Sequence, residues 1–152
     1  GPWGRPDMAL FLFTKAIISN EPIKVFNNGN MIRDFTYIDD ITESIFLLIN
    51  KIPKENKNFD RLLPNPSTSW APYRVLNIGN SNPIALMEYV KAIEEALGMK
   101  AIIKFMQMQP GDVEKTAADT FLLKDLIKFK PSTTVKEGVA NFIKWYRVYY
   151  DV

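Results

Sequence analysis

Two residue types are missing from this chain of 152 residues, which has no cysteine and no histidine. The lack of cysteine excludes disulfide bonds and thiolate metal sites. Because histidine is lacking, the chain has neither the commonest general base nor the commonest metal ligand. The class of Ser-His-Asp hydrolases is excluded for the same reason. A chain without cysteine also fits a reducing compartment, so a cytoplasmic location is expected.

Strong net charge and long apolar runs are lacking as well. The 19 basic and 17 acidic residues leave a formal net charge of +2. Because the lysines are dispersed along the chain, no nucleic-acid partner is expected. No apolar run reaches the roughly 18 residues of a membrane-spanning helix, since Thr14 and Lys15 interrupt the apolar segment 9–18. No membrane partner is expected either.

The residues that are present predict a globular chain of alternating helices and strands. Hydrophobic residues make up 47% of the chain, which argues against global disorder. Periodicity and end signals predict strands over 23–26, 74–78 and 101–105, and helices over 7–20, 40–51, 83–98, 119–129 and 134–150. The alternation indicates the α/β class. Three short strands make a small sheet, which suggests that part of the sheet lies outside this chain.

Helix starts and one long loop complete this prediction. Asp7 is expected to cap the first helix, and Asp40 is expected to cap the second. Thr134 and Glu137 have the spacing of a capping box at the last helix. The stretch 52–73 contains four prolines, so it is predicted to be a long loop of the kind that is usually functional or mobile.

Four segments, in order along the chain, carry a family resemblance. They are Gly1–Ala9 (GPWGRPDMA), Arg33–Asp40 (RDFTYIDD), Asn77–Ser81 (NIGNS) and Met108–Val113 (MQPGDV). Together they resemble the extended short-chain dehydrogenases that act as NAD-dependent nucleotide-sugar epimerases, and most closely the UDP-glucuronate 4-epimerases. The resemblance covers nearly the whole chain. It implies that residues 1–152 are the C-terminal substrate-binding subdomain with the last elements of a Rossmann-type domain.

The family also implies a mechanism that this chain does not complete. Bound NAD takes a hydride from C4 of the sugar and returns it to the other face of the 4-keto sugar. A tyrosine in a Tyr-x-x-x-Lys motif is the base, and a glycine-rich turn holds the dinucleotide. Neither motif occurs in this sequence. The N-terminal dinucleotide-binding region is therefore expected to be absent, no catalytic or cofactor-binding residue is assigned, and the isolated chain is expected to be inactive.

The resemblance places six residues of this chain at the UDP-sugar, namely Arg5, Met8, Phe26, Arg33, Gln109 and Asp112. Arg33 matches the family arginine that contacts the diphosphate. An arginine suits this role because a guanidinium can donate two parallel hydrogen bonds to phosphate. The alternative for Arg33 is a surface or ion-paired arginine beside Asp34. Asp112 matches a carboxylate that accepts hydrogen bonds from ribose hydroxyls. The alternative for Asp112 is a turn residue after Gly111.

The other four residues have weaker individual signals. Arg5 is a candidate for the sugar carboxylate or a phosphate, with a solvated loop arginine as the alternative. Phe26 matches a position whose backbone lies along the uracil, and its ring is expected to belong to the core rather than to the site. Gln109 stands where some relatives carry arginine, which leaves one phosphate contact neutral. Met8 matches a position that borders the nucleotide.

The expected function of the whole protein is UDP-glucuronate 4-epimerisation in polysaccharide biosynthesis, with NAD as cofactor and no metal. This chain is expected to supply recognition of the UDP-sugar. The alternatives are a 4,6-dehydratase or a decarboxylase of a nucleotide sugar, and an inactive fragment or UDP-sugar-binding module. Exposed apolar surface is expected where the other half would pack. The family also implies a homodimer whose contacts lie largely outside this chain.

Overall fold

The fold is given by a computed structural model, which describes residues 3–152, so that Gly1 and Pro2 of the first resembling segment lie outside the described residues. Its elements, in chain order, are α1 (Ala9–Ile18), β1 (Pro22–Val25), the 3-10 helix η1 (Phe26–Gly29), β2 (Ile32–Arg33), α2 (Ile38–Leu48), β3 (Ile84–Ala85), α3 (Leu86–Leu97), β4 (Ile102–Phe105), α4 (Phe121–Ile127) and α5 (Val135–Tyr150). The mixture of helices and short strands agrees with the predicted class.

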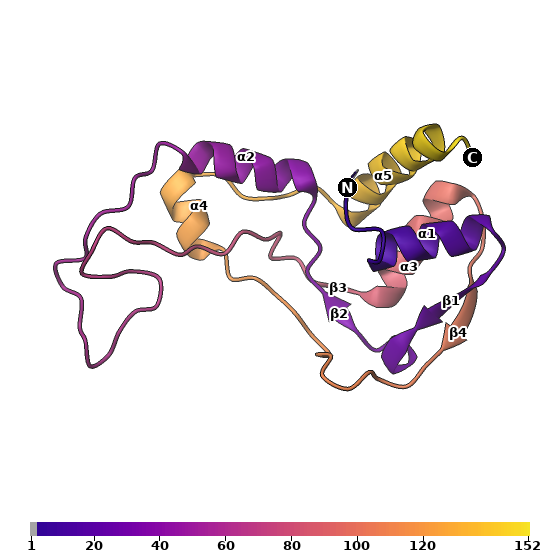
Figure 1. Ribbon diagram of the computed structural model, residues 1–152, viewed down its shortest axis with the longest axis horizontal. Coiled ribbons are helices and arrows are strands. Elements are labelled where there is room, and N and C mark those ends of the chain that lie inside the picture. Colours follow the sequence, from indigo (N-terminus) through magenta and orange to yellow (C-terminus); the bar gives the residue numbers. More distant parts are fainter. Residues whose placement is uncertain (1–2) are drawn as a thin grey trace.

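The elements are arranged in two lobes joined by extended segments (Figure 1). The core lobe contains α1, α3 and α5 together with the strand pairs. The loop lobe contains α2, α4 and the long loop that follows α2. β1 and β4 pair in parallel, whereas β2 and β3 form a short antiparallel pair. The chain passes between the lobes several times, so the loop lobe is tied to the core lobe at more than one point.

The hydrophobic core lies in the core lobe, between α1, β1, α3 and α5. Phe142 of α5 is fully buried and meets the ring of Phe11 edge-on, with 4.8 Å between the ring centroids. In β1, Ile23 and Val25 are buried while Pro22 and Lys24 are exposed, as expected for side chains that alternate across a strand. This core positions β1 and β4, and the loops at their ends form the candidate site.

Two predicted helix caps are wrong. Met8, and not Asp7, is the N-cap residue of α1, and it makes no side-chain capping bond. Asp40 lies inside the first turn of α2, where its Oδ2 accepts hydrogen bonds from the N–H groups of Ser132 and Thr133 at 3.1 and 2.9 Å. Asp40 thus holds Ser132 and Thr133, which precede α5, against the first turn of α2. Its partners are distant in sequence, and for this reason a local pattern misidentified its role.

The predicted cap of the last helix is confirmed, and one predicted strand is wrong. Thr134 Oγ1 accepts a hydrogen bond from the Glu137 N–H at 3.2 Å, at the start of α5. The segment 74–78 contains no strand, and its one β-contact is an isolated bridge between Arg74 and Thr68. A strand needs a neighbour to pair with, and the described part of the chain places no sheet beside this segment.

Candidate functional site

The loop of residues 106–116 connects β4 to the region of β2 and forms one wall of the candidate site. At its beginning, the Met106 N–H donates to the Val25 carbonyl at 2.9 Å, which continues the pairing of β4 with β1. Near its end, the Ile32 N–H donates to the Glu114 carbonyl at 2.8 Å. The loop is therefore fixed at both ends against the segment that contains Phe26 and Arg33.

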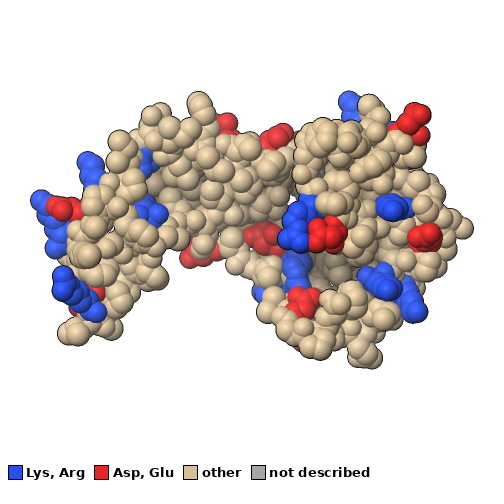
Figure 2. All heavy atoms as spheres, viewed as in Figure 1, with Lys and Arg blue, Asp and Glu red and all other residues tan. Residues whose placement is uncertain are grey.

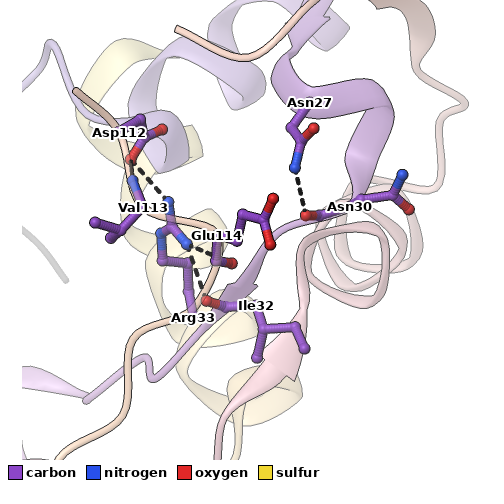
Figure 3. A network of polar contacts seen from close by, with 7 residues as sticks. All are labelled: Asn27, Asn30, Ile32, Arg33, Asp112, Val113 and Glu114. Carbon is purple, nitrogen blue, oxygen red and sulfur yellow. Dashed lines mark hydrogen bonds and ion pairs between the residues drawn. The ribbon is translucent and has the colours of Figure 1, made fainter. Parts of the chain in front are cut away.

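Arg33 and Asp112 form an ion pair across this junction (Figure 3). Arg33 Nη2 lies 3.0 Å from Asp112 Oδ1, and its Nη1 donates to the carbonyls of Ile32 and Glu114 at 2.9 and 3.1 Å. Asp112 Oδ1 also accepts the Val113 N–H at 2.8 Å. The two side chains are 21% and 36% exposed. The fold thus brings together two residues that the sequence assigned to the same ligand.

The ion pair leaves polar atoms free for a ligand. A guanidinium has five N–H donors. Three of those on Arg33 have acceptors within residues 3–152, which leaves the Nε–H and one Nη2–H. Asp112 Oδ2 accepts no hydrogen bond from any group within residues 3–152. The site can therefore present two positive N–H groups beside one carboxylate oxygen, a combination suited to a phosphate next to a diol.

The alternative ion pair between Arg33 and Asp34 does not form. Asp34 Oδ2 instead accepts the N–H groups of Ser81 and Ala118, both at 3.0 Å, and its Oδ1 accepts the Asn82 N–H at 3.4 Å. Asp34 therefore ties two crossing loops to the end of β2. The sequence interpretation missed this role, because the partners of Asp34 lie 47, 48 and 84 positions away.

A hollow of about 670 Å³ runs along α1 and β1 and reaches the 106–116 loop at Gln109. Phe26 and Gln109 line it together with Asp7, Leu12 and Lys24. The Gln109 carbonyl accepts the Asp112 N–H at 3.2 Å, so the hollow and the Arg33–Asp112 pair share one turn. Phe26 is half-buried, which leaves part of its surface available to a molecule in the hollow.

Arg5 and Met8 lie before α1, and no described contact joins them to Arg33 or Asp112. Arg5 Nε donates to Asp7 Oδ1 at 3.1 Å, and Nη2 pairs with the other oxygen of the same carboxylate. The hydrogen bonds from Arg5 hold the pKa of Asp7 below its usual value. Met8 is 54% exposed. Since Asp7 lines the hollow, the Arg5–Asp7 pair stands at its rim.

Other kinds of site were searched for in the described residues. Within residues 3–152, no cluster of three or more acidic side chains is arranged to hold a metal ion. No described helix combines the length and the apolar character needed to cross a membrane.

Comparison with known proteins identifies the family and the relatives to which this chain is similar. Residues 1–60 match the NAD dependent epimerase/dehydratase family. The chain is 53% identical over 150 residues to Protein CapI of Staphylococcus aureus, covering 99% of the chain and 45% of that protein. It is 48% identical over 150 residues to a probable UDP-glucuronate 4-epimerase of Rhizobium meliloti, covering 96% of the chain and 43% of that protein. Residues 1–60 thus match this family, and the similarity to the curated relatives extends over nearly the whole chain.

Solved structures of this family share the fold. MoeE5 in complex with UDP-glucuronic acid and NAD matches with a TM-score of 0.78 and 26% identity, over 98% of this chain and 44% of that one. The UDP-glucuronic acid 4-epimerase of Bacillus cereus, in complex with UDP-glucuronic acid and NAD, matches with a TM-score of 0.75 and 25% identity, over 96% and 42%. The chain thus spans less than half the length of the family members that it matches. The predicted resemblance and fold class are confirmed.

Proposed function

We propose that this chain is the sugar-nucleotide-binding part of an NAD-dependent UDP-glucuronate 4-epimerase. The observation that supports this most directly is the Arg33–Asp112 pair, which is linked through the turn at Gln109 to a hollow lined by Phe26 and Gln109. These four residues come from two distant segments, and the resemblance assigned them to one ligand. The 48% identity to a probable UDP-glucuronate 4-epimerase supports the choice of sugar.

In this proposal, each side chain recognises one part of the ligand. The free Nε–H and Nη2–H of Arg33 bind the diphosphate, because charge-assisted hydrogen bonds from a planar fork suit phosphate oxygens. Asp112 Oδ2 accepts hydrogen bonds from the ribose hydroxyls. The nucleobase lies in the hollow along Phe26. Gln109 contributes a neutral polar contact where an arginine would add a positive charge.

Arg5 and Met8 belong to the same proposal at the rim of the hollow. Arg5 would meet the sugar carboxylate or a phosphate, and to do so it must exchange Asp7 for the ligand. The pair is solvent-exposed, with side chains 74% and 61% accessible, and exposed ion pairs contribute little stability. Breaking the pair therefore opposes ligand binding only weakly. Met8 would border the nucleotide with its exposed thioether.

NAD would supply the hydride acceptor of the whole enzyme, but the residues of this chain do not fit it. Dinucleotide binding needs a glycine-rich turn between a strand and a helix. Here β1 is followed by Phe26–Gly29, which contains a single glycine and forms a 3-10 turn. We therefore assign residues 1–152 to the C-terminal substrate-binding region and place the dinucleotide-binding region N-terminal to it. No catalytic residue is assigned in this chain.

The test is product analysis by NMR, with the whole protein, NAD and UDP-glucuronate. The expected product is the 4-epimer, which has the same formula as the substrate. Loss of water would indicate a 4,6-dehydratase, and loss of carbon dioxide would indicate a decarboxylase. The absence of NAD-dependent conversion of any UDP-sugar would overturn the proposal. The isolated 152-residue chain with NAD is expected to give no product, since it lacks both the Tyr-x-x-x-Lys motif and the dinucleotide turn.

A further inference from the structure

The long loop of the loop lobe carries the whole positive charge excess of the chain. Residues 51–75 include five basic residues and two acidic ones, whereas the rest of the chain has 14 basic and 15 acidic residues. The basic residues are Lys51, Lys54, Lys57, Arg61 and Arg74, and all are exposed. Within the described residues, none of the five forms an ion pair. Figure 2 shows basic side chains gathered at the outer end of this lobe.

The middle of the same loop exposes two leucines to solvent. Leu62 is 90% exposed and Leu63 is 82% exposed. Beside them, Asp60 Oδ1 accepts the Leu62 N–H at 2.8 Å, and the guanidinium of Arg61 lies 5.7 Å from the ring centre of Trp70. A turn closed by a side-chain oxygen and a cation–π contact both restrain this part of the loop. The two exposed leucines therefore belong to a restrained segment.

We propose that residues 51–75 dock this protein onto the surface of an anionic phospholipid bilayer. Leu62 and Leu63 enter the interfacial region, and the lysines and arginines of the loop face the negatively charged headgroups. Clustered basic residues are attracted to anionic leaflets, and apolar side chains add binding when they are buried at the interface. Trp70, half-exposed beside Arg61, is of the residue type that prefers the headgroup level.

The shape and charge of the loop favour a lipid surface over a groove on another protein. The leucines are almost fully exposed, the five cations of the loop form no ion pair within the described residues, and a bilayer accepts exposed leucines without a matching cavity. The expectation of no membrane partner rests on the lack of a spanning apolar run. A contact with the membrane surface needs no such run.

The first test is co-sedimentation of the protein with vesicles. Vesicles of phosphatidylcholine mixed with phosphatidylglycerol are expected to bind at least about tenfold more tightly than pure phosphatidylcholine, and less tightly as salt rises. Leu62→Ser/Leu63→Ser is expected to weaken binding about tenfold or more. Its matched control is Phe46→Ser/Ile49→Ser, which removes two side chains of α2 and its C-cap that are 66% and 67% exposed and should leave binding unchanged.

The charge contribution has its own matched pair of variants. Lys54→Gln/Lys57→Gln is expected to weaken binding to the mixed vesicles about tenfold. Lys130→Gln/Lys144→Gln removes the same charge from exposed positions outside the loop and should have little effect. The loop variants should keep their melting temperature and their affinity for UDP, so that failure of this proposal remains distinguishable from failure of the proposed function.

A fluorescent label gives an independent readout, because the chain has no cysteine of its own. Leu62→Cys carrying an environment-sensitive fluorophore should shift to the blue on mixed vesicles, whereas Val148→Cys, at an 82% exposed position of α5, should not. Equal binding to both vesicle types, equal losses in the control variants, or no shift at position 62 would each overturn the proposal. A loop that serves a protein partner, or that is covered in the whole protein, gives no vesicle binding, and that result overturns the proposal as well.

Discussion

At the residue scale, Arg33 and Asp112 are expected to affect different parts of ligand binding. Arg33→Met should weaken UDP binding by roughly 10- to 100-fold and leave uridine binding nearly unchanged, because uridine has no phosphate. Asp112→Asn should weaken both, since the ribose is common to both ligands. Titration calorimetry or NMR shift titration with the two ligands measures the difference. Arg74→Met, which removes an exposed arginine of the loop lobe, is the matched control.

Asp34 makes a second prediction at this scale, concerning stability. Its carboxylate accepts hydrogen bonds from Ser81, Asn82 and Ala118. Asp34→Asn would replace one acceptor oxygen with an N–H donor that faces backbone donors. The free energy of unfolding should fall by about 1–3 kcal/mol, as measured by urea denaturation. Asp151→Asn is the control, because Asp151 is exposed and has a positive φ of 54°, a conformation that asparagine tolerates. Equal losses for both variants would contradict the role of Asp34.

The close approach of Gly79 belongs to the same junction. A Cβ atom on Gly79 would lie 2.5 Å from the Cβ of Ala118 and 3.4 Å from Asp34 Oδ2. The backbone at Gly79 therefore lies against the side chain of Ala118, and the space between them does not admit an added methyl group. Overpacking of this kind typically costs about 1–3 kcal/mol. This crowding explains why the segment NIGNS has a glycine at its centre.

The sequence predicted the local roles of single residues better than the distant ones. Thr134 is a cap, and its partner Glu137 lies three positions on, within reach of a spacing rule. Asp34 and Asp40 bind backbone N–H groups that lie 47 to 93 positions away. Nothing in the neighbouring sequence reveals such partners, since the fold alone brings them together. The contact between Arg33 and Asp112 was not predicted, although the family resemblance placed both residues at one ligand.

At the scale of elements, the joint between α3 and β4 is expected to depend on pH. Glu94 Oε1 accepts the Ala101 N–H at 2.9 Å, and Oε2 lies 3.0 Å from Lys100 Nζ. The hydrogen bond from Ala101, with that from Lys100, holds the pKa of Glu94 below its ordinary value against a smaller opposing effect of burial. A carboxylate with a lowered pKa in the folded state stabilises the fold at neutral pH, and this stabilisation is lost as pH falls through that pKa.

Glu94→Gln is therefore expected to lower the melting temperature at neutral pH. The difference from the parent chain should shrink as pH falls below about 4.3, the ordinary pKa of glutamate. Thermal melts across an acid-to-neutral pH series measure this convergence. Glu55→Gln, an exposed glutamate of the long loop, is the control and should show no such trend. A constant offset at every pH would indicate a packing defect rather than a lost charge.

Elements whose packing partner lies within the described chain were predicted well, and the segment 74–78, which has no strand beside it there, was not. The helical periodicities correspond to α1, α3 and α5, which bury one face each in the core lobe. The residues 74–78 have the pattern of a strand but pair with almost nothing in the described chain. Propensity for a strand becomes a strand only when a partner supplies the ladder of hydrogen bonds.

At the scale of the whole molecule, the two lobes differ in how well they bury apolar side chains. The connected hydrophobic core lies in the core lobe. In the loop lobe, α2 and its C-cap leave Ile45, Phe46 and Ile49 between 51% and 67% exposed, and Phe121 of α4 is 71% exposed. The sequence predicted exposed apolar surface, and the structure contains it. What covers this surface in the whole protein stays a prediction.

Exposed apolar surface of this extent is expected to make the isolated chain self-associate, because contact removes apolar area from water. Sedimentation velocity over a rising concentration series should show a growing fraction of dimers or larger species. Phe46→Ser/Ile49→Ser should shift association to higher concentration, whereas Val148→Ser, which removes a comparably exposed side chain from α5, should shift it less. A monomer at every concentration would mean that this face is stable in water. The exposed apolar side chains would then give no reason to expect that another part of the protein packs against them.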